Sequence, residues 1–105
     1  MILEAAMLQV IPGREAEFEA AFRKVSAIIA SMPGYGGHEL ARCVEAESGY
    51  LLLVHWERLQ DHTEGFRQSP RYDEWRAPLH HFYAPFPVVE HFDPVGPVLT
   101  RSVPV

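Results

Sequence analysis

Apolar positions along the first third of the chain change from a strand-like pattern to a helical one. From Ile2 to Ile11 only Glu4 and Gln9 interrupt the apolar residues, so both faces of a strand there would be nearly apolar. This pattern predicts a strand, and Pro12-Gly13 ends it. From Arg14 to Met32 the apolar residues recur at steps of three and four. This stripe predicts an amphipathic helix that Pro33-Gly34 terminates, and it consists of Phe18, Phe22, Val25, Ile29 and Met32.

The segment from Tyr50 to Tyr72 organises the second half of the chain. Its apolar run, Tyr50 to Val54, opens a strand that we predict over Tyr50 to Glu57 and expect to be buried on both faces. A turn signal at residues 46–49 pairs this strand antiparallel with one over His38 to Glu45. Helical patterns follow over Leu59 to Gln68 and Arg71 to Tyr83, and Pro78 is expected to kink or shorten the second. Val88 to Asp93 is the last predicted strand.

This order of elements, β-α-β followed by β-α-β, predicts an α+β fold of the ferredoxin-like split βαβ type. Its four-stranded antiparallel sheet would carry the helices on one face. The other face is also apolar, so we expect it to pack against a second copy in a homodimer. We expect one domain over residues 1–95 and a tail over 96–105 that packs on the partner subunit through Val98, Leu99, Val103 and Val105.

Composition narrows the possible partners. Nine basic and fourteen acidic residues give a net charge of −5 without a basic stripe, which argues against binding nucleic acid. Cys43 is the only cysteine, so no intrachain disulfide can form, and we expect it to be an ordinary half-buried strand residue. No basic segment precedes an apolar run, and no run reaches the ~18 residues that span a bilayer, so we expect a cytoplasmic protein without a membrane segment.

Several short motifs occur in a characteristic order. Pro12-Gly13 precedes the acidic helix, Pro33-Gly34-Tyr35 precedes the second strand, and Trp56-Glu57 ends the third, with His62 six residues after the tryptophan. Ser69-Pro70-x-Tyr72 and the closing segment from Pro87 to Phe92 follow. Over about residues 2–95, this pattern resembles the antibiotic biosynthesis monooxygenase (ABM) family of the dimeric α/β-barrel superfamily.

The resemblance implies a small oxygenase that oxidises quinols or polycyclic phenols with molecular oxygen and uses no flavin, heme or metal. Such a reaction needs a base or hydrogen-bond donor near the substrate hydroxyl, for which His62 and the hydroxyl of Tyr72 are the catalytic candidates. It also needs an apolar cage, for which the substrate-binding candidates are Trp56, Phe66, Trp75 and His55. Core packing remains an alternative for each aromatic residue, and a backbone hydrogen bond remains one for His62.

Other histidines offer weaker signals. We expect His55 and His91, both on strands, to face the dimer interface or to pair with Glu57 or Glu90. The adjacent His80 and His81 should point to different sides of a helix. The sequence has no His-Glu-x-x-His, Cys-x-x-Cys or glycine-rich phosphate loop, so we expect neither a metal site nor a bound cofactor.

Three other functions remain open. Heme degradation is disfavoured because the first strand lacks the asparagine typical of those relatives. An isomerase of small keto compounds would use a similar base in an apolar pocket. A dimeric, non-enzymatic binder of small ligands, or a stress-associated domain, would need the pocket but no poised base. A shifted titration of His62 within reach of a ligand therefore favours an enzyme over a binder.

Overall fold

The computed structural model describes residues 1–96, and the predicted contacts of the tail lie outside these residues. The predicted order of the main helices and strands is confirmed. The elements are β1 (Ile2–Gln9), α1 (Glu15–Ala30), β2 (Tyr35–Arg42), β3 (Gly49–Trp56), η1 (Asp61–Phe66), α2 (Pro70–Arg76), η2 (His80–Phe82) and β4 (Val89–Phe92).

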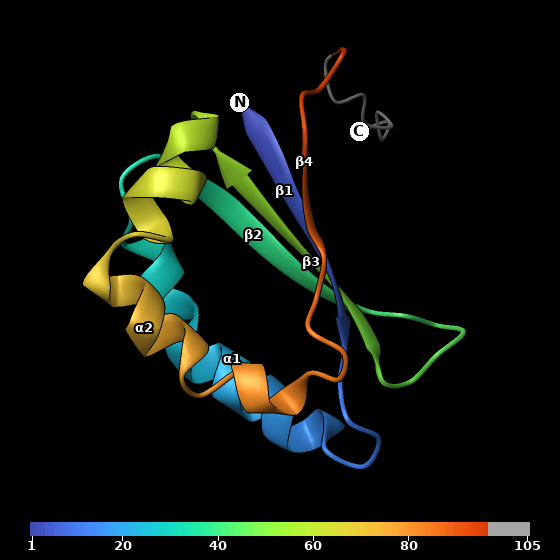
Figure 1. Ribbon diagram of the computed structural model, residues 1–105. Coiled ribbons are helices and arrows are strands. Elements are labelled where there is room, and N and C mark those ends of the chain that lie inside the picture. Colours follow the sequence, from blue (N-terminus) through green and yellow to red (C-terminus); the bar gives the residue numbers. More distant parts are fainter. Residues whose placement is uncertain (97–105) are drawn as a thin grey trace, which may run out of the picture.

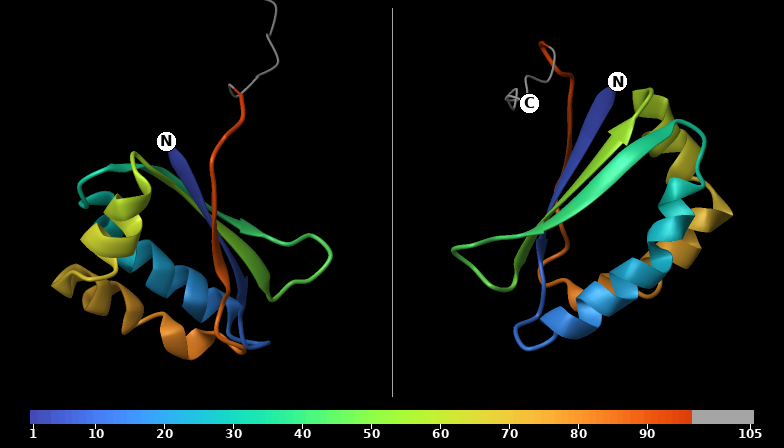
Figure 2. Two further views of the ribbon diagram at one scale, coloured as in Figure 1. Left: turned by 45° about the horizontal axis from the view of Figure 1, so that its top comes forward. Right: turned by 180° about the vertical axis from the view of Figure 1, so that it is seen from behind.

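The strands form one antiparallel sheet in the order β2-β3-β1-β4. The helices lie on one face of this sheet, and no helix within residues 1–96 covers the opposite face (Figures 1 and 2). The hairpin between β2 and β3 extends beyond the helical layer (Figure 2). The predicted ferredoxin-like α+β fold is therefore confirmed.

Strand parity decides which face each side chain meets. Tyr50, Leu52, Val54 and Trp56 on β3 are all buried beneath the helices. The alternate side chains of β3 are half-buried on the open face, and these are Leu51, Leu53 and His55. Trp56 and His55 therefore lie on opposite sides of the sheet.

The predicted boundaries of two strands were wrong. β2 runs from Tyr35 to Arg42 instead of from His38 to Glu45, because the glycines at 36 and 37 form a bulge instead of a loop. Tyr35 pairs with Trp56 while Gly37 pairs with His55, and Gly37 adopts φ +136°, which a residue with a side chain rarely does. β1 ends at Gln9, after which Val10 forms only an isolated bridge to Tyr83.

The second helical region is more broken than its sequence pattern predicts. Asp61–Phe66 winds as a π-helix, in which the amide of Arg67 donates to the carbonyl of His62 at 3.0 Å. α2 ends at Arg76, two residues before Pro78, which cannot donate to the helix; the predicted shortening is confirmed. The longest helix, α1, has 16 residues, and no helix within residues 1–96 is long and apolar enough to cross a membrane.

Candidate active site

A tight contact between two turns fixes the start of η1. Gly34 adopts φ +83°, and a Cβ atom added there would lie 2.2 Å from Oδ2 of Asp61, so only glycine fits. The Asp61 carboxylate also accepts hydrogen bonds from the backbone amide and the guanidinium of Arg58, both at 3.0 Å. These contacts hold Asp61, and its neighbour His62 is thereby directed beneath the sheet.

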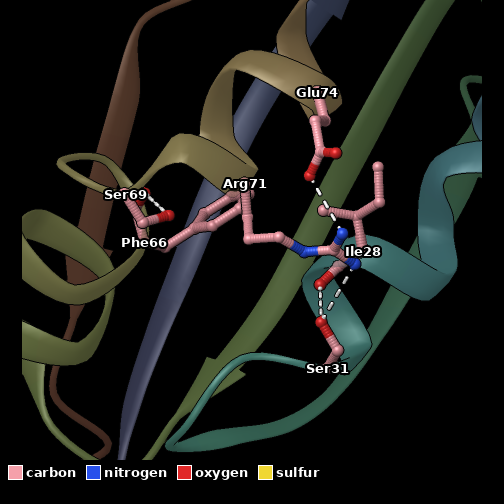
Figure 3. A network of polar contacts seen from close by, with 6 residues as sticks. All are labelled: Ile28, Ser31, Phe66, Ser69, Arg71 and Glu74. Carbon is pink, nitrogen blue, oxygen red and sulfur yellow. Dashed lines mark hydrogen bonds and ion pairs between the residues drawn. The ribbon is translucent and has the colours of Figure 1, made fainter.

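Polar contacts join the far end of η1 to the start of α2, and α2 in turn to the end of α1 (Figure 3). The hydroxyl of Ser69 donates to the carbonyl of Phe66 at 2.8 Å. Arg71 pairs with Glu74 at 2.9 Å and reaches the hydroxyl of Ser31, at the end of α1, at 3.5 Å. The wide π turn that carries His62 and Phe66 is thus held at both ends, and π turns of this kind are frequent at functional sites.

A chain of polar side chains runs beneath the sheet from β3 to β4. The indole N–H of Trp56 donates to Oε1 of Glu4 at 2.9 Å, and the same oxygen lies 3.4 Å from Nε2 of His62. On its other side, Nδ1 of His62 lies 2.7 Å from Nε2 of His91. The His62 ring also stacks on Trp56, with centroids 5.5 Å apart and planes inclined by 18°. Glu4 and His62 are 5% and 3% exposed.

Burial controls the protonation of this chain. It lowers the pKa of His62 to about 3, with further lowering from the nearby charges of His91 and Arg67. It also lowers the pKa of His91, again helped by Arg67. Burial raises the pKa of Glu4, although the hydrogen bond from Trp56 and the charge of Arg67 oppose that rise. At neutral pH His62 is therefore a neutral imidazole, and Glu4 is the stronger base of the two.

A cavity of about 50 Å³ opens beside Glu4 and His62. It has room for a few water molecules, whereas sites for drug-sized ligands measure ~300–1,000 Å³. Rings and aliphatic groups form most of its wall, and Arg67, His80 and two tyrosine hydroxyls add polar groups. Its lining residues are Glu4, Ala6, Leu8, Ile29, Leu52, His62, Phe66, Arg67, Tyr72, Trp75, His80, Tyr83, Phe86 and Val89.

The structure brings four of the six candidate residues to this cavity. His62, Tyr72, Phe66 and Trp75 all line it. Trp56 lies behind the wall, completely buried, and acts on the site through Glu4 and His62. His55 faces the open side of the sheet, away from the cavity.

Three further polar residues of the site were missed by the sequence reasoning. Glu4 lies on the same face of β1 as the buried Ala6 and Leu8. The sequence feature that could have marked it is a charged residue on an otherwise apolar, helix-facing side of the strand. His91, for which we expected a dimer interface or a neighbouring glutamate, lies opposite Glu4 in the sheet and contacts His62. Arg67 lies with its Cζ 5.7 Å from the ring centre of Tyr72. No local pattern marked it.

The adjacent His80 and His81 separate as predicted, since His80 lines the cavity and His81 is exposed. Within residues 1–96, no group of three or more His, Cys, Asp or Glu side chains is arranged to hold a metal ion.

Comparison with known proteins places this chain in a family. The chain is 58% identical over 95 residues to YczJ, an uncharacterized protein of Bacillus subtilis (strain 168), covering 90% of this chain and all of YczJ. A Bordetella bronchiseptica structure assigned to the antibiotic biosynthesis monooxygenases shares 38% identity and a TM-score of 0.86, covering 90% of this chain and 96% of its own.

The fold is shared more widely. The monooxygenase ActVA-Orf6 of Streptomyces coelicolor, in complex with nanaomycin D, has a TM-score of 0.80 at 20% identity, covering 95% of this chain and 92% of its own. The family model for antibiotic biosynthesis monooxygenases matches residues 1–78. The chain belongs to the antibiotic biosynthesis monooxygenase family.

Proposed function

We propose that this protein oxidises quinols or polycyclic phenols with molecular oxygen and without a cofactor. The observation that carries the proposal is the pairing of a buried Glu4–His62 contact with an aromatic cavity wall in a chain of this family. Burying a carboxylate costs free energy, and a plain binder of apolar ligands would gain nothing from that cost. The ActVA-Orf6 complex with nanaomycin D supports a polycyclic ligand for this fold.

The substrate supplies the electrons in this reaction. Loss of the hydroxyl proton gives an electron-rich phenolate, which passes one electron to oxygen. The aryloxy radical and superoxide then join through a new C–O bond at a ring carbon that carries hydrogen. The resulting peroxide anion takes up a proton, loses water and leaves a quinone, so one phenol and one O2 give one quinone and one water. The protein must accept the first proton and stabilise the oxyanion and peroxide.

Side chains around the cavity suit these tasks. His62 is neutral at pH 7, and its two ring nitrogens face Glu4 and His91. Its one N–H can serve the substrate oxygen when that oxygen displaces one of these partners. The hydroxyl of Tyr72 provides a second donor. Arg67 lines the cavity and adds a positive charge where negative charge develops on oxygen. Phe66 and Trp75 would pack against the rings.

A polycyclic substrate requires the 50 Å³ cavity to widen. Phe86 belongs to the connector between η2 and β4, lines the cavity and is 61% exposed. Its ring meets His80 edge-on with centroids 4.9 Å apart. Phe86 can therefore swing outward with a small loss of buried area, and we assign the entrance to this connector.

Oxygen uptake by the metal-free protein tests the proposal. Reduced naphthoquinols and hydroxylated polycyclic phenols form the panel, and autoxidation without protein sets the baseline. We expect uptake above baseline with at least one substrate and a loss of ~100-fold or more in His62→Gln. His81→Gln is the matched control, because it replaces an exposed histidine outside the cavity.

The outcomes separate the alternatives. Equal uptake by wild type and His62→Gln would preserve the oxygenase and remove His62 from its mechanism. Tight binding of a panel compound without any uptake would favour a binder. Conversion of a keto compound to an isomer without oxygen consumption would identify an isomerase.

We also propose that the chain works as a homodimer built through the open sheet face. Met7 and Phe92 on that face are 64% and 49% exposed, and Leu3, Leu51 and Leu53 share the same face on β1 and β3. An apolar sheet surface of this kind is stabilised by a second sheet packed face to face. The cavity lies on the helical side of the sheet, so each protomer would keep its own site.

A further inference from the structure

Glu4 lines the cavity and contacts its partners through only one of its two carboxylate oxygens within residues 1–96. Both polar contacts that Glu4 makes within residues 1–96 use Oε1, namely those with Trp56 and His62. Oε2 has no such partner, is not sealed off as a buried unsatisfied atom, and belongs to a residue that lines the cavity. A ligand hydroxyl that enters the cavity can therefore donate to Oε2.

The chain of contacts beyond Glu4 leads out of the core. His62 lies between Glu4 and His91, at 3.4 Å and 2.7 Å, and each of its ring nitrogens faces one of them. His91 sits on β4, an edge strand, and is half-buried, whereas Glu4 and His62 are buried. β1 and β4 place Glu4 directly opposite His91 in the sheet.

We propose that Glu4 is the base that takes the hydroxyl proton of the substrate, and that His62 and His91 pass this proton to solvent at the edge of the sheet. This inference rests on the proposed function, because it assigns the first step of that reaction. It gives roles to two residues, Glu4 and His91, that the sequence pattern did not mark as functional.

The proton steps balance. The O–H bond of the substrate breaks, Oε2 of Glu4 gains the proton, and the phenolate remains in the cavity. The carboxyl group then turns so that this O–H faces Nε2 of His62, which takes the proton while the Nδ1 proton of His62 moves to Nε2 of His91. His91 releases its own Nδ1 proton to water, and Glu4 returns to a carboxylate. Both rings are left with the proton on Nε2 and regain the Nδ1 proton by exchange before the next turnover. Because His62 is a weak base in its buried position, the proton passes through it without accumulating there.

The charged and titratable groups around Glu4 come from every neighbouring element. Trp56 on β3 donates to it, His62 and Arg67 approach from η1 and its end, and His91 faces it from β4. The positive charge of Arg67 favours the anionic form of Glu4 and the neutral form of both histidines. Because it disfavours a proton held on any of the three groups, it favours release of the proton to solvent. Around the rest of the cavity stand Tyr72, His80 and Tyr83.

Glu4→Gln tests the base. Glutamine keeps an oxygen that can accept the Trp56 hydrogen bond but cannot take up a proton. We expect turnover to fall ~100-fold or more, in the range that general bases supply, while the melting temperature at pH 8 stays equal or rises because a buried charge is removed. Turnover within ~3-fold of wild type, or a large loss of thermal stability together with the lost turnover, would overturn the assignment.

His91→Ala tests the exit path. This variant opens a space that imidazole can enter, and we expect turnover to fall and then to recover as imidazole is added, with His91→Gln remaining low. His81→Gln with the same imidazole additions is the control. Its turnover should equal that of the wild type and should not change when imidazole is added. A loss in His91→Ala that imidazole does not restore would show that His91 only supports the structure.

A measurement on the protein alone separates this inference from the proposed function. If the wild type oxidises no panel substrate, the oxygenase proposal fails, and the relay is judged from the imidazole nitrogen-15 spectra. If the ring nitrogen-15 resonances of both His62 and His91 in Glu4→Gln differ from those of the wild type, the three groups share protons. Independent titration of the two rings, unchanged by Glu4→Gln, would overturn the relay.

Discussion

The indole N–H of Trp56 donates to Oε1 of Glu4 at 2.9 Å, joining the end of β3 to the start of β1 inside the core. The two residues lie 52 positions apart in the chain. This bond supplies a fixed donor to a carboxylate that would otherwise lie buried beside a neutral histidine. It ties the packing of the core to the protonation of the candidate site.

Trp56→Phe removes that donor. We expect the free energy of unfolding to fall by about 2–4 kcal/mol, because a buried acceptor loses its partner and a cavity remains, and the pKa of Glu4 to rise further. Urea unfolding measures the first effect. Trp75→Phe is the control, since the indole of Trp75 makes no hydrogen bond within residues 1–96, and equal losses in both variants would remove the role of the bond.

Gly34→Ala should disrupt the start of η1. The added Cβ would meet the Asp61 carboxylate at 2.2 Å, and φ is +83°, so we expect a loss of about 2–4 kcal/mol. Gly13→Ala provides a matched comparison, because Gly13 has φ +92° but no atom within 4 Å of the added Cβ. It should lose only about 1 kcal/mol. Thermal unfolding of both variants decides whether the contact with Asp61 matters.

Stability should depend on pH through His62. Its pKa is about 3 in the folded protein, against an ordinary value of 6.5 that we assign to the unfolded chain, so the unfolded chain binds the proton first as the pH falls. Stability from this group is complete above pH 6.5 and declines by about 2–3 kcal/mol between pH 6.5 and 4.5. Glu4, whose pKa is raised, acts in the opposite direction and stabilises the fold as the pH falls.

His62→Gln should remove that acid sensitivity in part, since the pKa of His91 is also lowered. Urea unfolding at pH 7 and pH 4.5 measures the difference. If the free energy of unfolding falls equally in the wild type and the variant between pH 7 and pH 4.5, the assignment of a low pKa to His62 is contradicted.

Arg67→Gln should change the site without unfolding it. Arg67 is exposed, and its charge lowers the pKa of Glu4, His62 and His91, so its removal should raise all three. Proton NMR titration of the histidines measures this, and oxygen uptake should fall because the developing oxyanion loses a positive neighbour. Arg71→Gln is the control, because Arg71 pairs with Glu74 and Ser31 outside the cavity.

Leu53→Asp tests the open sheet face. Leu53 is half-buried at the centre of that face, between Ala5 and Glu39 on the neighbouring strands. We expect the dimer to dissociate, which sedimentation velocity would record as a halved mass, while the helical site keeps its structure. Ala20→Glu, on the exposed side of α1, should leave the mass unchanged. A dimer that survives Leu53→Asp would place the interface elsewhere.

Local patterns determined the elements and their order. The stripe from Phe18 to Ile29 defines α1 because every third or fourth residue meets the same surface, and Pro78 ends α2 because it has no amide hydrogen. The alternation in β3 separated Trp56 from His55 but did not say which of them meets the helices. Two apolar faces look alike in a sequence, and only the packing of α1 and α2 distinguishes them.

Tertiary structure decided the site. Glu4 interrupts an apolar strand in the sequence, and its role emerges only when Trp56, His62 and His91 converge on it from other elements. The bulge at Gly37 shifted β2 because a backbone with positive φ can pair where the glycine pattern predicted a loop. Periodicity reports how one segment meets water, whereas proton sharing depends on distances between segments that only the folded chain brings together.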